Sequence, residues 1–201
     1  MRPRRLIELL SLLLLVTACR SAPTTRYYVL APSNTAPETE ATSTGEPGLR
    51  IGVEPFTVDP PYDRDQLVYR LGVDSVEVGF YSYHRWAAPL SELVAVAMAE
   101  GLRGAPGIGS IEPWTSGGEY DALLHGRVLY LEEIDVPGQQ EARLRLELRL
   151  VDLEGSMIWS QEVFGSAAGQ SDTVAQIVEQ LYVAFDQALE QARAGLTRAN
   201  L

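Results

Sequence analysis

One nine-residue segment, Arg143 to Val151, alternates between aliphatic and charged residues, and this pattern constrains the fold more than any other. Successive side chains of a β-strand point to opposite faces of a sheet, so strict alternation predicts a strand with one buried and one solvated face. Turn-forming residues follow at Asp152–Ser156, and Met157–Phe164 is expected to return as a hairpin partner. The aliphatic positions are Leu144, Leu146, Leu148 and Leu150.

Apolar residues recur at helical spacing in two other places. They predict one helix over Leu90–Leu102 and a second from about Asp172 to Ala194. Two amphipathic helices and a sheet with one wet face predict an α+β fold, a two-layer α/β sandwich with a mixed or antiparallel sheet packed against both helices. The order of the strands does not follow from the sequence. The other expected strands are Tyr27–Leu30, Arg50–Val58, Leu67–Leu71, Ser75–Tyr81 and Ala122–Val136, with a turn-rich stretch at Gly104–Gly118.

The first 18 residues have the layout of an export signal. Arginines lead into an apolar run, Leu6–Val16, which would be about 16 Å long as a helix and is too short for a hydrocarbon core of roughly 30 Å. The run ends in Val16-Thr17-Ala18-Cys19, which resembles the lipobox of bacterial lipoproteins. Cys19 is the only cysteine, so no internal disulfide can form, and we expect it to carry the lipid anchor with fatty acids such as palmitate. The competing interpretations are an ordinary secretory signal with a chance cysteine and a buried thiol in a cytoplasmic protein.

These features divide the chain into three expected regions. Residues 1–18 form the signal peptide, residues 19–48 a lipidated N-terminus with a short strand and a flexible linker, and residues 49–201 the folded domain. Arg20 follows Cys19, where an aspartate would favour retention at the inner membrane. We therefore expect a lipid anchor on the periplasmic face, in the outer membrane rather than the inner one.

Charge and residue types argue against several functions. The formal net charge is −11, and there is no lysine, so we expect no nucleic-acid partner and no phosphate-binding loop. The two histidines, His84 and His125, show no metal-ligand spacing, so we expect neither a metal nor another cofactor. Glu132, Glu133 and Asp135 are interpreted as a solvated strand end rather than an acid/base pair. No catalytic constellation stands out, so we expect no enzyme.

Two motifs stand above this background. The first, Pro60-Pro61-Tyr62-Asp63-Arg64, continues to Arg70, and the second is Arg85-Trp86-Ala87-Ala88-Pro89-Leu90 at the start of the first helix. Together with Arg26-Tyr27-Tyr28-Val29-Leu30, they resemble the ABC-type transport auxiliary lipoproteins over essentially the whole mature chain. The candidates for partner contact or fold stabilisation are Tyr62, Arg64, Arg70, Arg85, Trp86 and Pro89, and fold stabilisation is the favoured interpretation.

The resemblance implies a non-catalytic periplasmic component of a lipid transport system. Its partners would be an MCE-domain protein and an inner-membrane permease with its ATPase, and the family is compatible with self-association into a homo-oligomer. Two alternatives stay open: an outer-membrane assembly lipoprotein that chaperones or plugs a barrel, and a lipoprotein that binds a small lipid itself. The second alternative requires an enclosed apolar pocket of several hundred Å³.

Overall fold

The computed structural model describes residues 23–32, 48–136 and 138–199. The predicted signal peptide, Cys19 and most of the predicted linker lie outside these residues. In the described part of the chain no helix is long and apolar enough to cross a membrane.

An antiparallel meander of three long strands forms the centre of the fold. It consists of β7 (Ala122–Val136), β8 (Gln139–Asp152) and β9 (Met157–Gly169), with β8 paired to both neighbours. The hairpin predicted from the alternating segment is therefore confirmed; β8 extends beyond both of its predicted ends, and β9 begins at Met157 as predicted and ends later. The four leucines of that segment are at most 1% exposed, so the predicted buried face is the one on which the core lies.

The other edge of β7 pairs with three short strands in succession. These are β2 (Leu49–Val53), β3 (Thr57–Val58) and β4 (Gln66–Arg70), and all three run parallel to β7. Beyond β2 lies β6 (Ile108–Pro113), while β5 (Gly79–Trp86) lies beyond β4 and is followed by β1 (Arg26–Tyr28). The sheet is mixed, as expected, and the N-terminal strand belongs to it.

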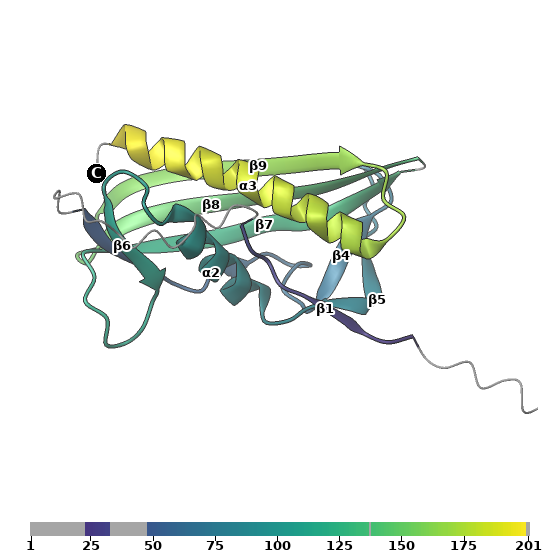
Figure 1. Ribbon diagram of the computed structural model, residues 1–201, viewed down its shortest axis with the longest axis horizontal. Helices are drawn as coiled ribbons and strands as arrows, with labels where there is room; N and C mark the ends of the chain where they lie inside the picture. Colours follow the sequence, from purple (N-terminus) through teal and green to yellow (C-terminus); the bar gives the residue numbers. More distant parts are fainter. Residues whose placement is uncertain (1–22, 33–47, 137, 200–201) are drawn as a thin grey trace, which may run out of the picture.

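Both helices cover the same face of this sheet, which gives the predicted two layers (Figure 1). The helix α3 (Val174–Ala199) lies along β8 and β9, and α2 (Leu90–Leu102) lies against β2 and β6 and touches α3. At Gly165 of β9, an added Cβ would be 1.8 Å from the carbonyl oxygen of Ala184, so a glycine is needed for α3 to approach the strand this closely.

The second helix begins two residues later than expected, for a local reason. The hydroxyl of Thr173 accepts a hydrogen bond from the N–H of Gln176, and the Gln176 side chain accepts hydrogen bonds from the N–H groups of Asp172 and Thr173. This reciprocal arrangement is a capping box, which satisfies N–H groups that the first turn of a helix leaves without partners.

Three strand predictions need correction. Arg50–Val58 is two strands rather than one, because Pro55 has no N–H to continue the ladder and the N–H of Phe56 bonds to Ser91 instead. The strand expected at Ser75–Tyr81 lies at Gly79–Trp86. The stretch expected to be turn-rich, Gly104–Gly118, contains β6. This strand has a single buried residue, Ile111, so its sequence shows no strand pattern, and its pairing with β2 keeps it extended.

Candidate functional site

A buried carboxylate, Glu132, brings together two of the predicted site residues. It lies in β7 on the face opposite the helices, and its side chain is fully buried. One oxygen accepts hydrogen bonds from the Tyr62 hydroxyl at 2.6 Å and from Nε of Arg70 at 2.8 Å. The other oxygen accepts two from Arg143 of β8, at 2.9 and 2.5 Å. We call these four residues the Glu132 cluster.

The Glu132 cluster corrects the prediction that this carboxylate is solvated. Its strand does not end at the surface: β4 pairs beside it, and the 59–65 segment places Tyr62 over the face that would otherwise meet water. Burial and then the hydrogen bond to Glu132 raise the pKa of Tyr62 to about 12, so its proton stays on the phenol at neutral pH. With both oxygens occupied by donors, Glu132 is arranged to hold strands together rather than to transfer a proton.

The neighbouring Glu133 is buried on the opposite, helix-covered face of the sheet. It is 3% exposed and accepts a hydrogen bond at 2.6 Å from the hydroxyl of Tyr81 in β5. Burial raises the pKa of Glu133, and burial together with this bond raises the pKa of Tyr81. The solvated interpretation of Glu133 is therefore also wrong. Consecutive residues of a strand point to opposite faces of the sheet, and at this point of β7 both faces are covered.

Arg64 holds the segment that covers the Glu132 cluster. Its Nε donates a hydrogen bond at 2.6 Å to the carbonyl of Pro61, and its guanidinium lies 3.7 Å from the centre of the Phe80 ring. A cation over an aromatic face is a stabilising contact, so Arg64 ties the covering segment to β5.

The second motif forms the corner between β5 and α2. Trp86 is 4% exposed in the core, and its backbone N–H donates to the backbone carbonyl of Asp65, while the Arg85 guanidinium pairs with the Asp65 carboxylate at 2.5 Å. Exposed Pro89 precedes α2, and its carbonyl accepts hydrogen bonds from the N–H groups of Glu92 and Leu93. Since Asp65 and Tyr62 belong to one segment, the two sequence motifs meet at the same place in the fold.

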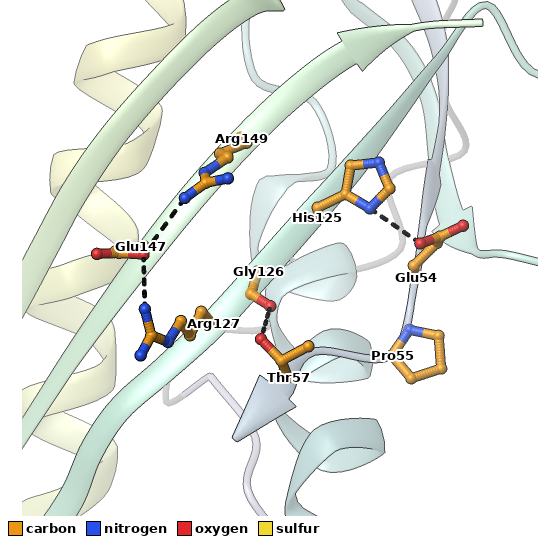
Figure 2. A pocket seen from close by; sticks show the side chains of 8 residues that line it. All are labelled: Glu54, Pro55, Thr57, His125, Gly126, Arg127, Glu147 and Arg149. Carbon is orange, nitrogen blue, oxygen red and sulfur yellow. Dashed lines mark hydrogen bonds and ion pairs between the residues drawn. The ribbon is translucent and has the colours of Figure 1, made fainter. Parts of the chain in front are cut away.

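A charged concavity lies further along the helix-free face (Figure 2). It has a volume of about 310 Å³ and lies between the β2–β3 connection and the outer faces of β7 and β8. His125 contacts Glu54 at 2.9 Å, and Glu147 faces both Arg127 and Arg149 at 3.7 Å. Its lining is mostly charged, unlike the apolar pocket that a small-lipid binder requires. Within the described ranges, no group of three or more potential ligands could hold a metal ion.

The sequence predictions missed Glu132 and Arg143, which join the motif residues in the Glu132 cluster, and they also missed the pair formed by buried Glu133 and Tyr81. One signal was available for the two glutamates, since they stand inside the apolar run from Val128 to Ile134 of a long strand. A carboxylate surrounded by apolar residues in a central strand is more typical of a buried, paired group than of a strand end.

Comparisons with known proteins agree with the fold. The structure is similar to a Xanthomonas campestris protein of the DUF330 family, with a TM-score of 0.66 and 15% identity, covering 88% of this chain and 94% of that one. A second solved structure, of an uncharacterised protein, has a TM-score of 0.58 and 19% identity, covering 89% of this chain and all of the other. No curated protein matches the sequence significantly.

The sequence profile of one family matches residues 28–192, which include both motifs and all four members of the Glu132 cluster. That family is described as the ABC-type transport auxiliary lipoprotein component. This match confirms the resemblance on which the sequence interpretation relied, and the chain belongs to the ABC-type transport auxiliary lipoprotein family.

Proposed function

We propose that this protein is an exported lipoprotein, acylated on Cys19, that serves as a non-catalytic component of an ABC system moving lipids between the two membranes. Its direct partner would be an MCE-domain protein, which works with an inner-membrane permease and ATPase, and the anchor would lie in the outer membrane. The single observation that carries this proposal is the family match over residues 28–192. The Val16–Cys19 lipobox supports the anchor, and with it the division into residues 1–18, 19–48 and 49–201.

The chemistry of the buried polar groups supports a binding role rather than a catalytic one. Glu132 is saturated by two arginines and a tyrosine, and Glu133 accepts from a tyrosine whose pKa is raised. Groups that serve as acids or bases need a face open to substrate. These groups face one another across strands, which is an arrangement suited to a rigid docking module.

The burial of each of the six motif residues indicates whether it stabilises the fold or is available for partner contact. Tyr62 and Trp86 are buried, and Arg70 donates to buried Glu132, so we assign these three to the fold. Arg85 keeps a third of its side chain exposed and Pro89 is exposed, so we assign this corner of the surface to partner contact. Arg64 lies against Phe80 and is assigned to the fold with the first group.

The test is affinity purification of the tagged, acylated protein from its native host in mild detergent, with the co-purifying proteins identified by mass spectrometry. We expect an MCE-domain protein, with or without its permease and ATPase. Arg85→Ala should lower the recovery of that partner without lowering the melting temperature, because the Arg85–Asp65 pair is partly hydrated. The matched control is Arg149→Ala, which removes another arginine with 60% of its side chain exposed and should leave recovery unchanged.

Other outcomes support other functions. Recovery of an outer-membrane barrel in place of an MCE-domain protein would support an assembly lipoprotein. Stoichiometric co-purification of a lipid with no protein partner would support a lipid-binding lipoprotein. Either result contradicts the proposal, as does the absence of any partner under conditions that preserve a known MCE complex.

A further inference from the structure

The connection between β4 and β5, residues 71–78, exposes three aliphatic side chains within six residues. Leu71 is 62% exposed, Val73 57% and Val76 94%. Single exposed aliphatic residues are ordinary on a protein surface, but a group of them at the tip of one connection is typical of an interaction site. We call residues 71–78 the apolar loop.

The apolar loop is held in place by the Glu132 cluster. Arg70, which donates one hydrogen bond to Glu132, donates another at 3.0 Å to the carbonyl of Ser75. The N–H of Ser75 in turn donates to the carbonyl of Gly72, which closes a turn. The exposed side chains are therefore presented from a fixed backbone, and ordering them against a partner costs less conformational entropy.

The apolar loop lies at a defined end of the sheet. Because β4 runs parallel to β7, it ends beside the last residues of that strand, and Gly72 lies next to Val136. The turn between β8 and β9 and the C-terminal end of α3 lie at the other end. Figure 1 shows β1, β4 and β5 on one side of the molecule and the C-terminal end of α3 on the other.

Residues 23–25 lead into β1 from the end of the sheet at which the apolar loop lies. β1 runs parallel to β5, with Arg26 beside His84, and β5 starts at Gly79 directly after the loop. The run from His84 back to Gly79 measures roughly 17 Å at strand spacing. Cys19 stands seven residues before Arg26, and seven residues span at most roughly 25 Å. An acyl anchor on Cys19 is therefore within reach of the level of the loop.

We propose that the apolar loop rests in the surface of the same bilayer that holds the anchor, with Leu71, Val73 and Val76 among the lipid headgroups and upper acyl chains. This contact rests on the proposed acylation of Cys19 and supplies a second attachment point, which fixes the orientation of the domain relative to the membrane. Asp74 and Glu77 lie in the same loop, and the chain is acidic as a whole, so the fitting surface is zwitterionic rather than anionic.

The test uses the full acylated protein with a fluorescent label on a single new cysteine. Acylation consumes the thiol of Cys19, the only natural cysteine, so Val76→Cys provides one labelling site for an environment-sensitive dye. Leu153→Cys is the matched control, because Leu153 is 64% exposed in the turn at the opposite end of the sheet. Both proteins are reconstituted in phosphatidylcholine vesicles whose acyl chains carry bromine, a short-range quencher.

We expect a blue shift and quenching at position 76 and neither at position 153. Equal emission and equal quenching at the two positions would overturn the proposal. An independent measurement is the transfer of acylated protein between vesicles. Leu71→Ser with Val76→Ser should speed this transfer by roughly 10- to 100-fold, because exposed aliphatic surface no longer leaves water. Leu153→Ser with Met157→Ser should not change it, and equal transfer rates for the two double variants would also overturn the proposal.

Failure of the lipoprotein assignment gives a different result. If Cys19 is not acylated, mass spectrometry of the purified protein lacks the lipid adduct, and neither labelled variant associates with vesicles. An acylated protein that binds vesicles but is not quenched at position 76 contradicts only the loop contact.

Discussion

Replacement of Glu132 by glutamine tests whether the Glu132 cluster holds the sheet together. The substitution keeps the shape of the side chain but removes its charge and turns one acceptor oxygen into an N–H₂ donor. That donor would face either Arg143 or the pair formed by Tyr62 and Arg70, all of which already donate to this carboxylate. Glu132→Gln therefore leaves both Arg70 and Arg143 without their counter-charge, and at least one of the donors that now bond to Glu132 would face an N–H₂ group.

The size of the effect follows from the burial of the partners. Breaking a buried ion pair by removing one partner costs about 3–5 kcal/mol. Arg70 and Arg143 keep 23% and 21% of their side chains exposed, so each can regain some hydration. We therefore expect a loss near the lower end of that range, about 3 kcal/mol of unfolding free energy. For a domain of this size, such a loss lowers the melting temperature by about 6–12 °C.

The assay is urea-induced and thermal unfolding, followed by circular dichroism. The matched control is Glu162→Gln, which removes a carboxylate paired with Arg145 on the same face of the sheet, where both side chains are more than two-fifths exposed. Because that pair is hydrated in both states, we expect the control to unfold almost as the wild type does. If Glu132→Gln is no less stable than Glu162→Gln, the reasoning about the cluster is wrong.

Three further predictions concern stability. The pKa of the Tyr62 phenol is near 10 in the unfolded chain and about 12 in the folded protein. The phenol therefore adds its full share to the unfolding free energy below pH 10, and this share is lost as the pH rises to about 12. In Tyr62→Phe, the unfolding free energy should fall less steeply over this pH range. Trp86→Ala should cost about 3–5 kcal/mol in chemical unfolding, since the indole is buried, whereas Trp114→Ala, at a residue 43% exposed, should cost less than about 1 kcal/mol. Gly165→Ala should lower the unfolding free energy by at least about 2 kcal/mol, because the new methyl group would meet the backbone of α3. Gly117→Ala should not lower it, because an added Cβ there meets nothing within 4 Å. Equal melting temperatures for these two variants would contradict the close approach of α3 to β9.

The sequence predicted those parts of the fold in which a helix or strand has a periodic pattern of apolar residues within its own sequence. The leucine alternation of β8 requires a buried face, and the apolar spacing of α2 and α3 requires a surface to cover, so the two layers follow from each element taken separately. The same patterns could not predict β6, which has one buried residue and is a strand because β2 lies beside it.

The candidate site divides in the same way. The sequence marked Tyr62, Arg70, Arg85 and Trp86 because their residue types cluster in two short motifs. The structural roles of these residues depend on Glu132 and Asp65, which contact them only in the folded chain. Glu132 is 62 residues from Arg70 in the sequence, and Asp65 is 20 residues from Arg85. A carboxylate in a strand is solvated or buried according to what covers it, and the covering segment arrives from elsewhere in the chain.

By itself, the sequence predicted the two-layer architecture and the family, because each depends on a contiguous pattern or on motif residues that can be matched one by one. The export and acylation signals are contiguous patterns of the same kind, and they stay predictions. Only the tertiary structure decided the strand order, the burial of the paired glutamates in β7 and the position of the apolar loop at the end from which residues 23–25 lead into β1. The physical reason is that strand pairing and burial are properties of residues brought together from distant parts of the chain, whereas periodicity is a property of neighbours.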